Sequence, residues 1–179
     1  MIQPVRFCMM IAALVSLVLV QSQTAYPEGK RISGTGKLVA LLSEAKVSSS
    51  GESRHEISVV VAQDADRSPD PDWDNAQVHH VVASDCVAGN CTDKGYRTYT
   101  HRNGARTFVA FEGTTKAVQR PNGPPDVTFD GRWWFTGGEG KFQGIAGGGT
   151  FKGQVTPAGV TYSLDSTEQP AWRVRGRPF

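Results

Sequence analysis

The sequence has 179 residues, of which 39% are hydrophobic and 20% are charged, with 19 Lys and Arg against 17 Asp and Glu. This length suits one globular domain of about 150 residues once a processed segment is subtracted. A net charge of +2 without a long basic block argues against a protein built mainly to bind nucleic acid. The 20 Gly and 10 Pro indicate a turn-rich chain that still folds.

The amino-terminal segment has the pattern of an export signal. Residues 7–20 form an almost uninterrupted apolar run that follows a single positive charge at Arg6. A permanent membrane helix needs about 20 such residues, whereas a secretory signal needs fewer. We therefore expect a signal peptide at 1–22, with Ala25 as a second cleavage point, and a secreted or periplasmic protein. An uncleaved membrane anchor is the alternative.

The cysteines agree with export. Cys8 lies in the predicted signal, and Cys86 and Cys91 are separated by Val-Ala-Gly-Asn. In an oxidising compartment such a pair predicts a short disulfide-closed loop. A zinc site is the alternative, but the sequence offers no second pair of thiols to complete it.

Short runs of apolar and β-branched residues, separated by Gly, Pro, Asn and Asp, fill the remainder of the chain. Such runs predict β-strands. The predicted strands are 37–42, 56–62, 77–84, 96–101, 106–112, 127–135, 150–155 and 160–165.

The segments between these runs carry turn signals. Asn103 and Gly104 favour a tight hairpin because both tolerate positive φ, and the Pro-rich segment 121–125 predicts a rigid loop. No stretch keeps a 3.6-residue apolar period over three turns, and the best helical candidate, 38–46, fits a first strand equally well. Residues 23–170 are therefore predicted to form one all-β domain, an antiparallel barrel or sandwich.

The glycine-rich segment narrows this choice. Residues 137–147 read Gly-Gly-Glu-Gly-Lys-Phe-Gln-Gly-Ile-Ala-Gly, without the spacing of a phosphate-binding loop. This run resembles the Gly-Gly-Thr-Gly-Lys-Phe-x-Gly-Ile-x-Gly segment of allene oxide cyclase-like and dirigent-like barrels, with Glu139 in place of the Thr. Residues 149–151, Gly-Thr-Phe, continue the pattern.

The resemblance implies an eight-stranded antiparallel β-barrel of calycin-like type, often oligomeric, with an apolar lumen. Relatives include plant cyclases of fatty-acid-derived epoxides, proteins that guide phenol coupling, and bacterial polyketide cyclases. No family catalytic residue carries over, and a fold does not define an activity. Phe142 and Ile145 are expected to pack the glycine-rich turn against the barrel end.

A barrel lumen needs inward side chains, and period-two alternation suggests which residues supply them. Along 127–135 most apolar residues share one face, whereas Arg132 and Trp134 fall on the other. Polar anchors such as Glu112 would serve only if their faces point inward, and an exterior position is preferred for them. The lumen candidates are Tyr99, Glu112, Phe129, Arg132, Trp133, Trp134, Phe135 and Tyr162.

The function expected is binding of a small apolar or amphipathic molecule in the lumen, without catalysis and without a cofactor. The first alternative is a cofactor-free cyclase or isomerase that folds a reactive apolar substrate in the lumen. The second is an envelope module that assembles through the barrel exterior. The sequence leaves open a homo-oligomer and gives no sign of a nucleic-acid partner.

The acidic segment before the third predicted strand could bind a metal ion. Asp70, Asp72 and Asp74 offer carboxylates at alternate positions, which would suit Ca²⁺. Asn75 stands where a calcium loop needs Gly, and Val81 stands where it needs an acid. A solvated loop is therefore preferred, and no metal is expected.

Two further groups of residues receive plain interpretations. His79 and His80 are neighbours on a strand, so they point to opposite faces and cannot bind one metal together. The basic tail 171–179 could contact an anionic membrane surface, but a solvated tail is the preferred interpretation.

Overall fold

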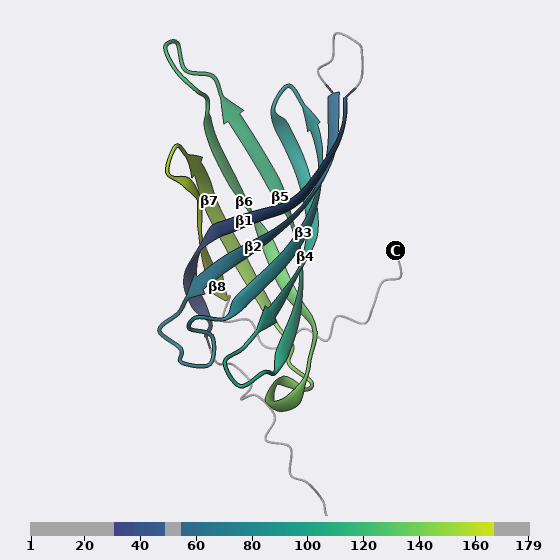
Figure 1. Ribbon diagram of the computed structural model, residues 1–179, viewed down its shortest axis with the longest axis vertical. Coiled ribbons are helices and arrows are strands. Elements are labelled where there is room, and N and C mark those ends of the chain that lie inside the picture. Colours follow the sequence, from purple (N-terminus) through teal and green to yellow (C-terminus); the bar gives the residue numbers. More distant parts are fainter. Residues whose placement is uncertain (1–30, 49–54, 167–179) are drawn as a thin grey trace, which may run out of the picture.

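The computed structural model describes residues 31–48 and 55–166, so the predicted signal and basic tail lie outside the described residues. Eight antiparallel strands follow one another around a closed barrel (Figure 1). This confirms the predicted all-β, eight-stranded antiparallel barrel. The elements are β1 (Ser33–Ser48), β2 (His55–Arg67), β3 (Gln77–Val87), β4 (Asn90–Thr100), β5 (Arg106–Val118), β6 (Asp126–Gly138), the 3₁₀ turn η1 (Gly140–Phe142), β7 (Gly148–Thr156) and β8 (Gly159–Ser166).

Tight turns join the strands where the sequence places Gly and Asn. Ala88 and Gly89 both have positive φ, the pattern of a type I′ hairpin, between β3 and β4. The predicted turn at Gly104 is confirmed, with φ of 80° and a hydrogen bond from its amide to the carbonyl of His101. Residues 38–46 lie in β1, so the strand alternative is the one confirmed.

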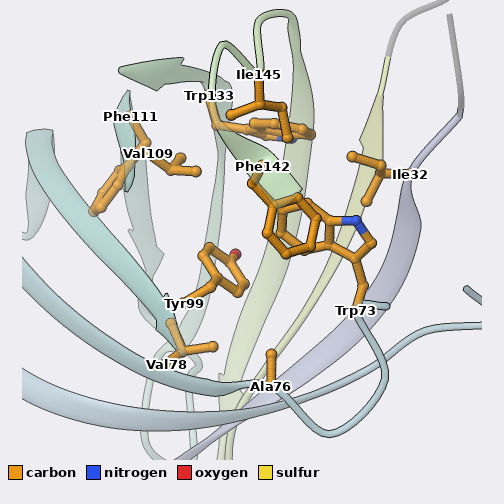
Figure 2. Packing of buried hydrophobic residues seen from close by; sticks show 10 residues of the cluster. All are labelled: Ile32, Trp73, Ala76, Val78, Tyr99, Val109, Phe111, Trp133, Phe142 and Ile145. Carbon is orange, nitrogen blue, oxygen red and sulfur yellow. The ribbon is translucent and has the colours of Figure 1, made fainter. Parts of the chain in front are cut away.

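One end of the barrel is filled by side chains. We call it the closed end; it carries the connections 68–76, 101–105 and 139–147 and is lowest in Figure 1. Trp73 and Phe142 enter it from two of these connections, and their ring centroids lie 5.6 Å apart. Phe142 is completely buried and Ile145 is nearly so, as the sequence predicted. The cluster comprises Ile32, Trp73, Ala76, Val78, Tyr99, Val109, Phe111, Trp133, Phe142 and Ile145 (Figure 2).

The opposite half of the lumen, here the open half, is less tightly filled. Inward positions of β2 and β3 alternate with outward ones, and the deepest, Ala62 and Val78, are buried. Further from the closed end, Val60 and Val82 face inward yet are only half-buried. Phe129 and Phe151 on the facing wall are half-buried as well. Solvent therefore reaches the inner wall of this half.

The seam between β1 and β8 explains part of this opening. Their register pairs run only from Ser33 opposite Asp165 to Lys37 opposite Thr161. Beyond Lys37, β1 pairs with β2 alone, while β7 and β8 end in a short hairpin. The barrel wall is consequently lower on the β7–β8 side than on the β1–β6 side (Figure 1).

Inward glycines make room for aromatic rings on neighbouring strands. A Cβ at Gly36 would lie 2.2 Å from Cζ of Tyr162, and one at Gly153 would lie 2.3 Å from Cζ of Phe129. Such distances are far below van der Waals contact. The rings therefore lie directly over glycine backbone, an arrangement that lets a sharply curved sheet keep large side chains inside.

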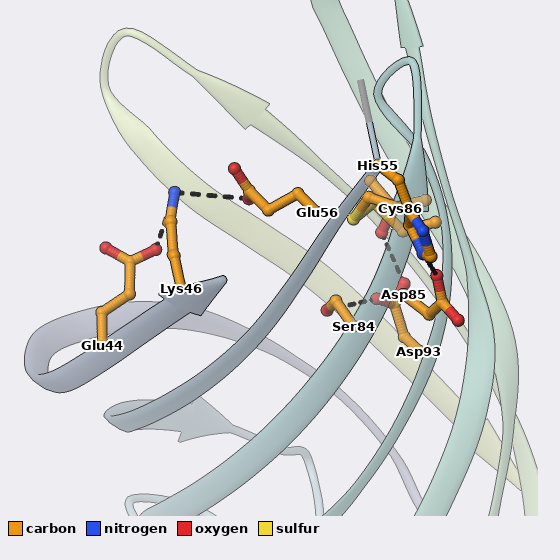
Figure 3. Close-up of a disulfide and its surroundings, with 10 residues drawn as sticks. Glu44, Lys46, His55, Glu56, Ser84, Asp85, Cys86 and Asp93 are labelled. Carbon is orange, nitrogen blue, oxygen red and sulfur yellow. Dashed lines mark hydrogen bonds and ion pairs between the residues drawn. A yellow bond between two sulfur atoms is a disulfide. The ribbon is translucent and has the colours of Figure 1, made fainter. Parts of the chain in front are cut away.

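The disulfide predicted from the sequence is present. Cys86 and Cys91 are opposite each other on β3 and β4, with an S–S distance of 2.11 Å and a Cα–Cα distance of 4.0 Å. It closes the β3–β4 hairpin at the rim of the open half, close to the ion pair of His55 with Asp85 (Figure 3).

Removing this disulfide should lower stability modestly. For a loop this short, chain entropy predicts that the variant carrying Cys86→Ala and Cys91→Ala loses about 2 kcal/mol, measured by denaturant unfolding. Peptide mapping after alkylation without reductant should find both cysteines unlabelled in the parent protein. Labelling of both would contradict the bond.

The exterior of the barrel is partly apolar. Large apolar side chains on β2, β3 and β4 are 40–55% exposed on the outer face, namely Ile57, Val59, Val81, Val87 and Tyr96. No helix in the described part of the chain is long and apolar enough to cross a membrane.

Candidate functional site: a charged floor in the lumen

Six polar side chains gather inside the barrel where the packed half meets the open half. They come from β2, β3, β4 and β8, and all lie on the inward face of their strands. We call this group the charged floor: Asp64, Asp66, His80, Arg97, Tyr99 and Tyr162.

Asp64 is at the centre of the floor. Its side chain is 1% exposed, and its Oδ2 lies 2.7 Å from Nδ1 of His80 and 3.8 Å from Nη2 of Arg97. The Tyr162 hydroxyl donates to the same oxygen at 3.0 Å. A buried carboxylate is costly unless it is paired, and these three partners supply the pairing.

Asp66 extends this network toward the closed end. The Tyr162 hydroxyl lies 2.5 Å from Oδ1 of Asp66, and it reaches that atom across β1 only because Gly36 has no side chain. Burial raises the pKa of Asp66 to about 6, although the Tyr162 hydrogen bond and the charge of Arg97 act in the opposite direction. This carboxyl group therefore changes charge close to neutral pH.

Arg97 supplies the positive charge. Its guanidinium carbon lies 4.3 Å from the ring centroid of Tyr162 and 5.5 Å from that of Phe111. Burial alone would lower the pKa of Arg97, but the surrounding phenol and carboxyl groups outweigh it and raise the pKa. The side chain is held as a fixed cation between two aromatic faces.

Two atoms of the floor keep unused hydrogen-bonding capacity. Oδ1 of Asp64 and Nη1 of Arg97 are enclosed and have no hydrogen-bond partner within residues 31–48 and 55–166. Buried polar atoms usually have a partner, so an unpaired one calls for a bound water, an ion or a functional role to explain it. The floor therefore has one free acceptor and one free donor.

The floor can be approached from the open half. The side chains of His80 and Arg97 are 13% and 11% exposed, whereas Asp64 lies beneath them. Below the floor, a small pocket of about 20 Å³ beside Asp66, Tyr99 and Trp73 has room for about one water molecule. An entering molecule would thus meet His80 and Arg97 first.

A second polar group lies on the inner wall nearer the rim. Asp93 accepts hydrogen bonds from Ser84 Oγ at 2.6 Å and from Thr115 Oγ1 at 2.7 Å (the first is drawn in Figure 3). The three residues come from β4, β3 and β5. They add a polar group to the largely apolar wall above the floor, next to inward Ser58 of β2.

The lumen candidates from the sequence divide into two groups. Glu112, Arg132 and Trp134 do not line the lumen: Arg132 is 72% exposed and pairs with Glu112 across the outer face of β5 and β6. Trp134 follows the buried Trp133, so it must point outward. The candidates on the inward face are Tyr99, Phe129, Trp133, Phe135 and Tyr162.

The carboxylates of the acidic segment have partners within the protein. The Asp70 carboxylate accepts the amide of Asp72 at 3.0 Å, and Asp74 accepts the amide of Ser68 at 3.3 Å. Asp72 pairs with Lys141. The three carboxylates that would have suited Ca²⁺ thus have separate partners, and the described residues contain no group of three or more His, Cys, Asp or Glu fit for a metal.

Four residues of the floor escaped the sequence prediction. The second strand was predicted to end at 62, which left Asp64 and Asp66 in a loop. Continuing the alternation from Ala62 would have placed both of them on the inward face. His80 and Arg97 are likewise inward positions of β3 and β4, on strands predicted without any assignment of their inner face.

Comparisons of the chain with protein-family models, with curated proteins and with solved structures find no significant match. The resemblance of residues 137–147 to allene oxide cyclase-like and dirigent-like barrels therefore stays a prediction. The geometry of the lumen carries the functional conclusion.

Proposed function

We propose that this chain is an exported barrel that binds a small amphipathic molecule in the open half of its lumen. The observation that carries the proposal is the combination of a partly exposed apolar inner wall with a charged floor whose His80 and Arg97 side chains remain partly exposed. Known ligand pockets share this composition, a mostly apolar lining with a few polar groups that fix orientation.

The apolar body of the ligand would lie against the wall of the open half. Val60 and Val82 on one side face Phe129 and Phe151 on the other. Removing about 200 Å² of apolar ligand surface from water contributes about 5 kcal/mol, before the cost of immobilisation. An aliphatic chain or a small ring system has enough surface for such a contribution.

The polar end of the ligand would be held at the floor. The partly exposed guanidinium of Arg97 offers a fixed positive charge, which favours a carboxylate or carbonyl oxygen. Asp64 beneath it disfavours a second negative charge. A ligand with one acceptor group at one end and an apolar remainder therefore fits best.

Export is part of the proposal. The disulfide between Cys86 and Cys91 supports it, because such bonds persist mainly in oxidising compartments. The apolar run before residue 22 supports it independently. A lumen that carries a poorly soluble molecule would be useful in a periplasm or outside the cell.

Blocking the lumen should abolish binding. Val82→Trp adds a ring inside the open half, and we expect it to weaken binding of a fluorescent fatty-acid probe, cis-parinaric acid, by about tenfold or more. Val81→Trp is the matched control, since it adds the same ring on the outer face of the same strand and should leave affinity within about twofold. Fluorescence titration gives both values. Equal affinities for the two variants, or no binding by the parent, would refute the lumen as the site.

A native ligand can be sought directly. Organic extraction of protein purified from its native envelope, read by mass spectrometry against a mock preparation, should yield a compound in roughly stoichiometric amount. The Val82→Trp variant should yield much less of the same compound. Equal recovery from both would place the compound outside the lumen.

A further inference from the structure

His80 and Asp64 form a pair that ligand binding alone does not require. Nδ1 of His80 lies 2.7 Å from Oδ2 of Asp64, and a carboxylate only accepts, so Nδ1 carries the proton. The other ring nitrogen, Nε2, then holds a lone pair. It makes no hydrogen bond within the described part of the chain, and the side chain is partly exposed to the lumen.

This arrangement suits His80 to act as a general base. A carboxylate behind an imidazole fixes its tautomer and orientation and stabilises the imidazolium that forms when Nε2 takes a proton. The two ring nitrogens point away from each other, so Nε2 is directed away from the buried Asp64. A group resting on the floor would meet the basic nitrogen.

The opposite register position supplies the complementary charge. Arg97 on β4 pairs directly with His80 on β3, so the two side chains rise from neighbouring points of the inner wall. Arg97 cannot lose its proton, and its side chain is 11% exposed. It can stabilise negative charge that develops on an oxygen beside His80.

We infer that the charged floor is a proton-transfer site, with His80 as base, Asp64 as its positioning residue and Arg97 as the oxyanion-stabilising group. The inference rests on the proposed lumen binding. The substrate class is an enolisable carbonyl compound with an apolar substituent. Its carbonyl oxygen would lie at Arg97 and its apolar part along the wall of the open half.

The reaction is an isomerisation that needs no further reactant. The C–H bond next to the carbonyl breaks, the proton goes to Nε2 of His80, and the electron pair forms the C=C bond of an enolate whose charge rests on oxygen beside Arg97. The imidazolium then returns its proton to the γ carbon of a β,γ-unsaturated substrate. The double bond ends in conjugation with the carbonyl, and His80 regains its starting form.

A medium-chain β,γ-unsaturated ketone in D₂O tests this step. The parent protein should convert it to the conjugated isomer, followed by ultraviolet absorbance, and NMR should find mainly protium at the γ carbon, because Nε2 carries the α proton there. His80→Asn should lower the rate about 100-fold or more, the usual contribution of a general base. His79→Asn, on the outer face of the same strand, should stay within about twofold.

Asp64→Asn tests the positioning role separately. His80 is faced by Asp64 from β2 and by the cation Arg97 from β4. Without the carboxylate the imidazolium loses its stabilising partner, so the pH at which the rate reaches half its maximum should fall by about one unit or more. A lower rate with an unchanged pH midpoint would make Asp64 a structural residue only.

Binding of the saturated analogue of the ketone, measured in parallel, separates this inference from the proposed function. Binding with no isomerisation beyond that of His80→Asn would overturn the proton-transfer site and leave lumen binding intact. Absence of both binding and isomerisation would overturn both. Turnover that persists in His80→Asn would remove His80 from the mechanism.

Discussion

Replacing Asp66 with Asn should stabilise the protein at neutral pH. The pKa of Asp66 is raised from 3.8 to about 6, chiefly by burial, so the folded state prefers the protonated acid. Between these two values the folded state binds a proton that the unfolded state has lost, and stability falls as pH rises. The difference corresponds to about 3 kcal/mol. The Asp66→Asn variant does not titrate, so it escapes this loss.

The measurement is denaturant unfolding of both proteins from pH 4 to pH 7. The stability of Asp66→Asn minus that of the parent should grow by about 2.5 kcal/mol across this interval, because the unfolded carboxyl group is already partly ionised at pH 4. Asp126→Asn is a control, because the hydrogen bond from exposed Arg120 lowers the pKa of Asp126 below 3.8. Its stability relative to the parent should therefore stay nearly flat from pH 4 to pH 7. A difference for Asp66→Asn that stays flat with pH would contradict the burial argument.

Adding a methyl group at Gly36 should destabilise the barrel by about 3 kcal/mol, at the upper end of the usual cost of overpacking. The new Cβ would lie 2.2 Å from the Tyr162 ring and 2.4 Å from Oδ1 of Asp66, and both groups are buried. Neither can withdraw without breaking the hydrogen bond between them.

A double-mutant cycle shows whether the ring is the cause. In a Tyr162→Leu background, Gly36→Ala should cost at least about 1 kcal/mol less than in the parent, because the clashing ring is gone. Gly123→Ala is the matched control, since nothing lies within 4 Å of the added atom, and it should change stability by less than about 0.5 kcal/mol. Additive costs at Gly36 and Tyr162 would refute the direct clash.

Local signals were sufficient to predict the strands. Turn residues such as Asn103 and Gly104 separate the apolar runs. Each hairpin forms between two neighbouring runs, so the turn residues and the run lengths largely determine its backbone hydrogen bonds. The glycine-rich segment was likewise interpretable, because Phe142 and Ile145 are its only large apolar residues and both are buried at the closed end.

The charged floor was harder to predict for a physical reason. Asp is disfavoured in strands, so the sequence loses strand propensity at Asp64 and Asp66, the two residues that β2 contributes to the charged floor. Their environment is created by Arg97 and Tyr162, which are distant in the chain and meet them only once the barrel closes. Neighbouring residues of a strand point to opposite faces. Strict use of this rule would have placed Trp134 outside the lumen once Trp133 was placed inside.

The short seam between β1 and β8 has a consequence for how the molecule folds. Every other neighbouring pair of strands is a hairpin that can form from nearby residues, whereas the seam joins residues more than 120 positions apart, such as Ile32 and Ser166. Closing so long a loop carries the largest entropy cost in the domain. We therefore expect the joining of β8 to β1 to be the last step of folding, with the ion pair of Arg31 and Asp165 forming at the closed end. A circular permutant that joins β8 to β1 by a short linker at the closed end, and opens the chain in the 121–125 loop, would turn the β1–β8 pairing into a local hairpin.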